Sequence, residues 1–262
     1  MAVRIETPEG EEALTELLQF HDHVYEYRSA CHLEFLPLTL PILTGESSFA
    51  RGRELRPFLA RDGGEIVARV VAAVDGRYHE LWPERLGHLL LFEAVPGGGE
   101  ATRLVMNAAC EWLRERGMEA ARAGMGMLEL PFVIDDYESL PPLGVRQNPS
   151  YYHAFLKDAG FESEKGWVDY RIRVTPELVA RYESSVEGAR RAGVRIVPLR
   201  EIASDRRRKE FTATYNETFR GHWGYSPFSE EDLSLLLEFQ APLGALDTSL
   251  VAYLGGEPVG VL

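Results

Sequence analysis

The spacing of apolar residues predicts an alternation of strands and helices along the chain. Residues 2–6 predict a short strand, and the apolar positions within 14–25 recur every three or four residues, as on one face of a helix. Residues 86–95 are apolar almost throughout, which predicts a strand covered on both faces. The segment 101–116 again has helical spacing, and Gly117 is placed to end that helix.

The middle of the chain contains a hairpin and a long irregular loop. Gly63-Gly64 separates two strands, and a further strand is predicted at 118–128. Residues 130–149 contain four prolines and no clear period, so they predict a loop. A helix at 149–161 and a strand at 166–174 follow. Because long ordered loops in compact domains are more often functional than idle, we expect the loop to have a role.

Two Thr-Pro pairs predict helix starts. Thr7-Pro8 and Thr175-Pro176 each supply a capping hydroxyl and a proline at the first helical position. The second pair begins a helix that is expected to end near Gly193. The whole order of elements, with strands and helices in one chain, predicts an α/β (α+β) fold.

Two segments recur in the same order at nearly the same separation. When the Gly-Gly-Glu of each hairpin is aligned, Gly63 matches Gly255, 192 positions later. The sequence VRI begins at Val3 and again at Val194, 191 positions later. Each match is short, but the shared offset and order predict an internal duplication.

The duplication predicts the division of the chain. Residues 1–175 form the first copy, 176–193 a linker helix, and 194–262 the N-terminal part of a second copy. The sequence finishes on a hairpin, whose outer edge would lack a partner. We expect either a fragment of a longer protein or a second copy that was shortened in evolution, and the open edge predicts self-association, such as a homodimer, or a missing segment.

Composition and charge narrow the function. The chain has 262 residues and a net charge of −13, which disfavours nucleic acid and anionic membranes as partners because both carry negative phosphate. The start of the chain lacks a signal-peptide pattern, and no run of about 18 apolar residues could span a membrane. Two cysteines, Cys31 and Cys110, favour a reducing cytoplasm. His21 and His23 lie two apart, a poor spacing for one metal ion on a helix, so no metal is expected.

Two stretches resemble the GNAT superfamily of acyltransferases: LLLFEAVPGGGEATRLVMNAACEWLRERG at 89–117 and NPSYYHAFLKDAGF at 148–161. The resemblance covers the first copy nearly end to end, and the tandem arrangement is similar to that of two-domain members. It implies a mixed, mostly antiparallel GNAT-like sheet flanked by helices, with a partial second copy. It also implies acetyl-CoA as co-substrate.

The glycine turn before the helix at 101–116 is the expected site for that co-substrate. Glycines permit unusual backbone conformations, and a helix N-terminus offers unpaired N–H groups and partial positive charge to a pyrophosphate. Gly99-Glu100-Ala101 matches half of the superfamily motif, whereas Pro96 replaces its Arg or Gln. Glu100 would repel a phosphate, and Arg103 could offset it. The alternative is a tight strand-to-helix turn in which the glycines have only a conformational role and bind no ligand. The resemblance implies these cofactor-binding residues: Val95, Gly97, Gly98, Gly99, Glu100, Ala101, Thr102, Arg103 and Asn148.

Catalysis in the superfamily needs a base for the amine and an acid for the leaving thiolate. Glu93 is the candidate base, since burial of a carboxylate raises its pKa; the alternative is an exposed strand end. The position at which many members carry the acidic tyrosine is Leu156, which cannot donate a proton. Tyr151 and Tyr152, a turn earlier, are the candidate substitutes.

These features leave functions of different classes open. The first is an N-acyltransferase that moves an acetyl group from acetyl-CoA to a small-molecule amine by direct attack. The second is a non-catalytic, degenerate module that binds a ligand or acts as a scaffold, which Pro96 and Leu156 favour. A third is an aminoacyl- or acyl-transferring enzyme of cell-wall or thiol metabolism.

Overall fold

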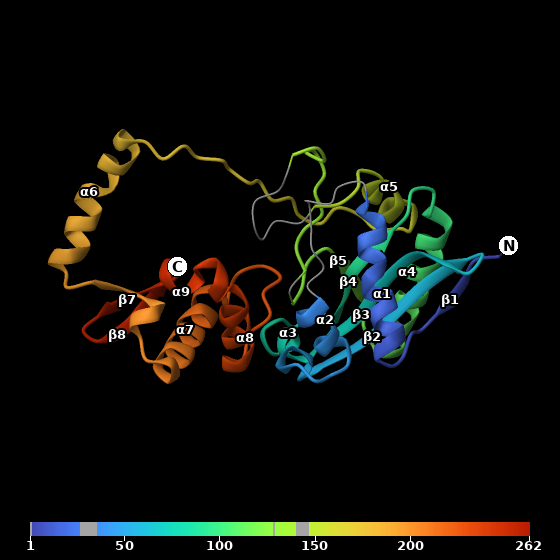
Figure 1. Cartoon of the computed structure of the whole chain (residues 1–262), viewed down its shortest axis with the longest axis horizontal. Coiled ribbons are helices and arrows are strands. Elements are labelled where there is room, and N and C mark those ends of the chain that lie inside the picture. The colour runs from blue at the N-terminus through green and yellow to red at the C-terminus, as the bar shows by residue number, and fades with distance from the viewer. Residues whose placement is uncertain (1, 27–35, 128, 140–146) are drawn as a thin grey trace. The chain divides into compact units, whose positions relative to one another are not determined.

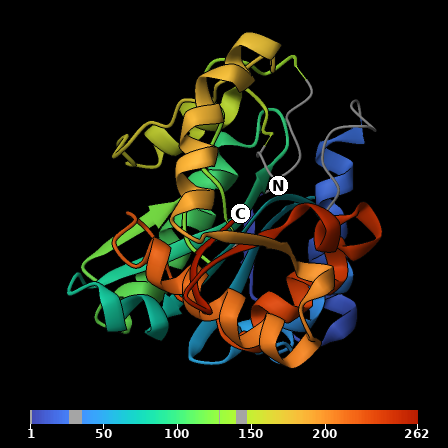
Figure 2. The ribbon, with the colours of Figure 1, turned by 90° about the vertical axis from the view of Figure 1, so that its left-hand side faces the viewer.

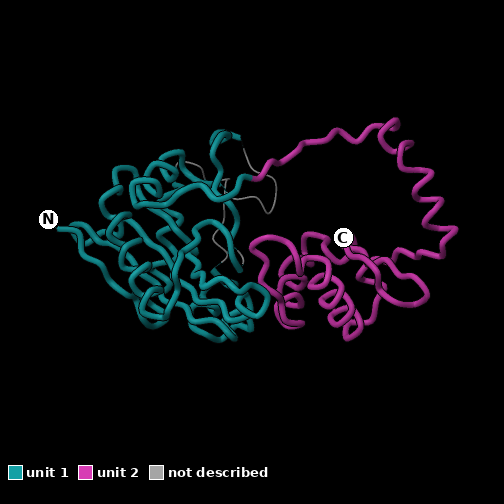
Figure 3. Tube along the Cα trace, turned by 180° about the vertical axis from the view of Figure 1, so that it is seen from behind, with its two compact units in different colours: residues 1–166 teal, residues 167–262 magenta. Residues whose placement is uncertain are grey.

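The chain folds into two compact units. The structure is a computed structural model and describes residues 2–26, 36–127, 129–139 and 147–262. The first unit is Met1–Gly166 and the second is Trp167–Leu262 (Figure 3). Each unit has a sheet of its own.

The first unit contains a five-stranded mixed sheet in sequential order. Its strands are β1 (Arg4–Glu6), β2 (Arg53–Asp62), β3 (Glu65–Asp75), β4 (Leu86–Ala94) and β5 (Ala120–Ala123). The pairs from β1 to β4 are antiparallel, and β4 pairs with β5 in parallel. The predicted mixed, mostly antiparallel sheet is therefore confirmed.

Helices cover both faces of this sheet (Figure 1). On one face Leu113 of α4 packs so closely on β4 that a side chain at Gly87 would lie 2.5 Å from it. On the other face Arg69 of β3 donates to the carbonyl oxygens of Leu17 and Leu18 in α1, at 2.8 and 3.0 Å. The helices of the unit are α1 (Glu11–Val24), α2 (Leu36–Leu43), α3 (Gly76–Leu81), α4 (Gly99–Glu115) and α5 (Tyr151–Asp158), with a 3-10 turn at Ser48–Ala50.

Strand β4 is irregular near its end. Its pairing with β3 changes register between Arg69 and Val71, and Leu91 has a φ of 53°. Its pairing with β5 ends at Leu89 and Ala123, although β4 itself continues to Ala94. Over its last five residues β4 is thus paired on the β3 side but not with β5.

The second unit is smaller and has a three-stranded antiparallel sheet. Helix α6 has no buried residue, and Figures 1 and 2 show it apart from α7 and α8. The elements are α6 (Pro176–Arg191), β6 (Arg195–Pro198), α7 (Ser204–Phe219), α8 (Glu230–Gln240), α9 (Ala245–Thr248), β7 (Leu250–Leu254) and β8 (Glu257–Val261), with 3-10 turns at Leu199–Glu201 and Ala241–Leu243.

The first strands of both units pair in the same register. Ile5 lies opposite Ala60, and 191 and 192 positions later Ile196 lies opposite Ala252. The register of the following hairpin shifts directly after Ala60 and directly after Ala252. The shared irregularity supports the internal duplication, which stays a prediction together with its division at 175 and 193.

Two sequence-based expectations are wrong. Residues 166–174 do not form a strand, because no strand pairs with them, and Val168 and Tyr170 are 73% and 81% exposed. Helix α1 begins at Glu11, after Gly10 with a φ of 81°, and not at Thr7-Pro8. The Thr7 hydroxyl accepts from Arg56 at 3.1 Å instead of capping a helix.

Three composition-based expectations concern the described residues only. Within them, no helix combines the length and apolar character needed to cross a membrane. Nor do they contain three or more His, Cys, Asp or Glu side chains grouped to hold a metal ion. Cys110 is half-buried on α4, and burial raises the pKa of its thiol. Cys31 lies outside the described residues.

Candidate active site

Glu93 is buried at the end of β4 among polar partners. Glu93 is 3% exposed, so the alternative interpretation, in which it lies at an exposed end of the strand, is wrong. Arg69, which is fully buried, lies directly opposite Glu93 in the β3–β4 ladder. The hydroxyl of Tyr152 donates to Glu93 Oε2 at 2.5 Å. A buried carboxylate requires such partners, since an isolated charge is costly to remove from water.

Tyr152 connects α5 to the same point on β4. Its side chain is fully buried, and its hydroxyl oxygen accepts the Ala94 N–H at 2.8 Å. Burial and the nearby Glu93 carboxylate hold the pKa of Tyr152 well above its usual value. Its phenol therefore stays protonated and fixes the end of β4.

Tyr151 reaches β4 from a more accessible position. It is half-buried, and its hydroxyl donates to the Ala94 carbonyl oxygen at 2.9 Å. The structure thus brings both candidate tyrosines to Ala94, next to Glu93, whereas Leu156 packs in the core. The sequence could not tell which tyrosine is the better candidate acid, because the two differ in burial, which only the folded structure shows.

The conformation and packing of the turn after β4 explain why residues 97 and 98 are glycines. Gly98 N–H donates to the Val95 carbonyl at 3.0 Å, with Pro96 and Gly97 between them, and Gly97 has a φ of 81°. Proline followed by a glycine of positive φ is typical of a type II turn. A Cβ on Gly98 would lie 3.0 and 3.1 Å from the Val95 and Val67 carbonyl oxygens, so backbone packing demands glycine there. A Cβ on Gly97 would meet nothing within 4 Å, so that side of the turn is open.

The N-terminus of α4 follows this turn. The helix begins at Gly99, and no side chain caps it. The first N–H groups of a helix lack intrahelical acceptors, so those of residues 99–101 remain as donors. Phe155 of α5 packs against Gly99, where a Cβ would lie 3.2 Å from its ring. Glu100 and Arg103 form an exposed ion pair at 2.6 Å, and Arg103 lowers the pKa of Glu100.

Three of the predicted cofactor residues have buried side chains. The side chains of Ala101 and Thr102 are buried, and the Thr102 N–H donates to Gly98 at 2.8 Å. Asn148 Oδ1 accepts the Val133 N–H at 2.7 Å, and its Nδ2 donates to the Val133 and Pro149 carbonyls. Asn148 therefore connects Val133 to Pro149, and its contact with a cofactor stays a prediction.

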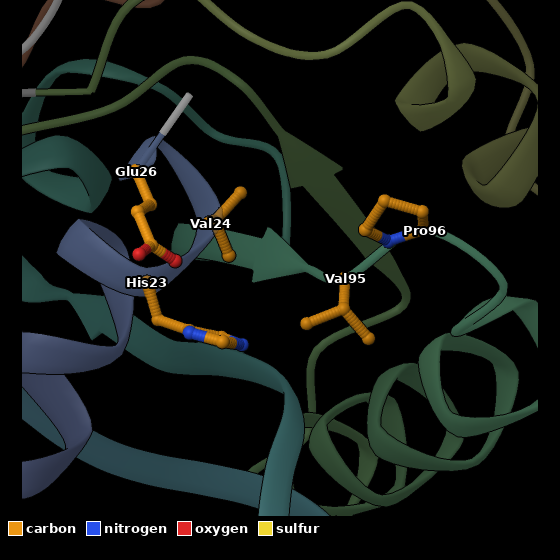
Figure 4. Close-up of a pocket in the computed structure, with 5 residues that line it drawn as sticks. All are labelled: His23, Val24, Glu26, Val95 and Pro96. Carbon is orange, nitrogen blue, oxygen red and sulfur yellow. The ribbon is translucent and has the colours of Figure 1, made fainter. Parts of the chain in front are cut away.

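A pocket of about 400 Å³ lies between the end of α1 and the end of β4. Its lining residues are His23, Val24, Glu26, Val95 and Pro96 (Figure 4). The walls are largely apolar, while His23 and Glu26 contribute polar groups. Of these five residues the sequence predicted Val95 to bind a cofactor, but not the three residues at the end of α1, because nothing in the linear pattern places α1 beside this turn.

Two further polar residues near β4 were also missed. The N–H of Leu91 donates to Glu129 Oε2 at 2.9 Å, in the region where β4 and β5 no longer pair. Arg69, opposite Glu93, could have been found, since a charge in an apolar strand is a signal of its own. Glu129 carries no such signal, because it lies in an irregular segment.

Comparison with known proteins gives the fold a name. No family model matches the chain. A solved glucosamine N-acetyltransferase region from a fungal multi-domain β-N-acetylglucosaminidase covers 99% of this chain over 27% of its own, with 18% identity and a TM-score of 0.54. A tandem GNAT protein from the clavulanic acid biosynthesis pathway covers 99% of this chain over 73% of its own, with 14% identity and a TM-score of 0.51. The chain has the GNAT fold.

A curated sequence relative matches over a large part of the chain. It is a bacterial ceramide synthase from Caulobacter vibrioides, 22% identical over 234 residues, which are 87% of this chain. The chain spans 60% of the length of that relative.

Proposed function

We propose that the protein is an N-acyltransferase that moves an acetyl group from acetyl-CoA to a small-molecule amine by direct attack. The observation that carries the proposal is the meeting of three features at the end of β4: divergence from β5, an uncapped helix N-terminus and two tyrosine hydroxyls at Ala94. The fold supports it, since GNAT is an acyltransferase fold. The Caulobacter relative supports amide formation, because a ceramide is an N-acylated amino alcohol.

The N-terminus of α4 and the gap between β4 and β5 bind the acetyl-CoA donor. The N–H groups of Gly99, Glu100 and Ala101 bind the pyrophosphate of the donor, because they have no acceptor within the helix. Arg103 neutralises the Glu100 carboxylate beside them. The pantetheine arm lies between β4 and β5, where the strands no longer pair.

Tyr151 supplies the proton for the leaving thiolate. It is the accessible one of the two tyrosines, and its phenol already donates a hydrogen bond at the end of β4. Tyr152 and Glu93 hold that end in place through their mutual hydrogen bond. Glu93, which is 3% exposed, also stays a candidate base.

A matched pair of variants tests donor binding. Gly97→Asp and Gly97→Asn are nearly isosteric and carry the same cost at a φ of 81°, but only the aspartate adds a negative charge to the open side of the turn. A ligand at 100 times its Kd stabilises the folded state by about 2.7 kcal/mol. We expect acetyl-CoA to raise the Tm of the wild type and of Gly97→Asn, and not that of Gly97→Asp. Equal shifts in both variants would place the donor elsewhere.

A non-catalytic ligand-binding module is the second candidate. Pro96 serves the type II turn, and Phe155 packs on Gly99, so the turn is fully accounted for by packing. This candidate predicts no thermal shift with millimolar acetyl-CoA or with a longer acyl-CoA.

A further inference from the structure

Leu91, near the end of β4, has an unfavourable backbone conformation. Among the described residues, Leu91 and Met127 are the non-glycine residues with positive φ, at 53° and 42°. Both contribute to one small apolar cluster with Val71 and Leu90. A positive φ is unfavourable for leucine and methionine because of steric contact with their Cβ atoms, and such strain gathers at functional sites. Here its consequence is that the Leu91 N–H points to an acceptor outside the sheet ladder.

That acceptor is the carboxylate of Glu129, which is held by its own turn. Glu129 N–H donates to the Gly126 carbonyl at 2.6 Å. Gly126 packs on the His88 ring of β4 so tightly that a Cβ would lie 2.4 Å from it. The turn is therefore fixed against β4, and it places a half-buried carboxylate at the point where β4 and β5 part.

We propose that Glu129 is a catalytic residue that competes with the acyl carbonyl for the Leu91 N–H and, once displaced, receives the attacking amine. The inference rests on the proposed function. A thioester carbonyl in the gap between β4 and β5 needs a donor for the negative charge that develops on its oxygen, and Leu91 N–H is the donor aimed there. The displaced carboxylate stays within reach of the acyl carbon, because Gly126 anchors its turn.

The transfer balances with these groups. The amine nitrogen forms a bond to the acyl carbon, and the bond from that carbon to sulfur breaks. The proton that the nitrogen loses goes to the Glu129 carboxylate. Tyr151 gives its phenolic proton to the departing thiolate, and the phenolate regains a proton from solvent. The products are an amide and the free thiol.

Glu129 suits this role better than Glu93 does. Glu93 is 3% exposed, lies opposite Arg69 and accepts the Tyr152 hydroxyl. Glu129 is half-buried, and the donor to its Oε2 is a backbone group that a carbonyl oxygen can satisfy equally well.

Two variants separate competition from proton transfer. Glu129→Ala removes the competing acceptor and the base, whereas Glu129→Gln keeps a neutral acceptor for Leu91 but cannot take a proton. Glu138→Gln, an exposed residue of the following loop, is the control. The Kd of acetyl-CoA is measured by calorimetry, and single-turnover rates are measured with a panel of primary amines.

We expect Glu129→Ala to bind acetyl-CoA about tenfold more tightly, because a charged acceptor no longer has to be displaced. Both Glu129 variants should lose about 100-fold or more in amine-dependent rate, as is typical on loss of a general base. A merely structural role would weaken donor binding instead.

Each other outcome overturns the inference. If Glu129→Ala binds acetyl-CoA no more tightly than the wild type, or if its rate is retained, Glu129 does not act as proposed while the proposed function stands. If neither the wild type nor any variant binds acetyl-CoA, the proposed function fails with it. Glu129→Gln keeps the Leu91 N–H paired, so its result stands even if Glu129→Ala folds poorly.

Discussion

The first three strands of the two units pair alike but are covered differently. In the first unit α4 packs on β1, β2 and β3, and Ala60 is fully buried beneath it. At the matching positions of the second unit, Ala252 is half-buried and its neighbour Ile196 is 61% exposed. Strand pairing is thus specified by the strands and their Gly-Gly turn, whereas burial of a sheet face needs a helix from elsewhere in the sequence.

The opposite faces of these sheets differ in charge. Arg69 pairs with Leu59 in the first unit, and the matching pair in the second is Val261 with Val251. The arginine is therefore not needed for the hairpin itself. Its partner is on the next strand, β4, where Glu93 lies directly opposite. The difference teaches that a buried charge marks the part of the first unit that carries the candidate site.

The largest expected effect comes from making the first unit resemble the second. Arg69→Val leaves Glu93 buried without its cationic neighbour, so we expect a loss of about 3–5 kcal/mol in the free energy of unfolding. The double variant Arg69→Val/Glu93→Leu should regain most of this loss. Urea denaturation, with hydrogen exchange to assign the transition to the first unit, measures both; equal losses in the single and double variants would contradict the explanation.

A second effect depends on pH and should be confined to the first unit. His88 is buried on β4, and both of its ring nitrogens lack a hydrogen-bond partner among the described residues. Burial lowers the pKa of His88 from 6.5 to about 4; Arg122, His79 and Arg53 act in the same direction, and Asp75 opposes them.

Because the unfolded chain binds the proton more readily, stability is fully present above pH 6.5 and falls as the pH drops from 6.5 to about 4. The loss is on the order of 3 kcal/mol. His88→Leu should flatten this dependence in urea titrations at several pH values, and His153→Gln, an exposed control, should leave it unchanged. A wild-type curve that is flat over this range would refute the prediction.

The third effect tests whether the chemistry resides in the first unit. Tyr151→Phe removes the accessible phenol, so single-turnover acyl transfer should slow about 100-fold while acetyl-CoA binding is kept. Tyr182→Phe, at an exposed position of α6, is the matched control and should retain the full rate. A normal rate for Tyr151→Phe would assign proton donation to another group.

The smallest effect compares the two sheet faces directly. Ala60→Leu adds volume under α4 and should cost about 1–3 kcal/mol of unfolding free energy. Ala252→Leu, at the matching position of the uncovered face, should change it by less than about 0.5 kcal/mol. Comparable losses in both variants would mean that the second face is covered in solution.

Local signals in the sequence predicted local structure well where no competitor existed. Thr175 caps α6, with its hydroxyl accepting the Leu178 N–H at 3.3 Å, as the Thr-Pro pair predicts. The same pair at Thr7 fails because Arg56 takes its hydroxyl. The apolar run at 86–95 correctly predicted β4 as a covered strand. The strand predicted at 166–174 does not form, because a strand needs a neighbouring strand to pair with and a local pattern does not show whether one lies beside it.

The sequence by itself determined the covered strand β4, the helix α4 that follows it and the glycine turn between them. These follow from periodicity and backbone preferences, which act within a few residues. The mixed sheet and the candidacy of Glu93, Tyr151 and Tyr152 came from the resemblance to the GNAT superfamily. Only the tertiary structure decided that Glu93 is buried opposite Arg69, that Tyr151 is the accessible tyrosine, and that Glu129 reaches Leu91. Burial and hydrogen-bond partners depend on residues distant along the chain, so they appear only when the chain is folded.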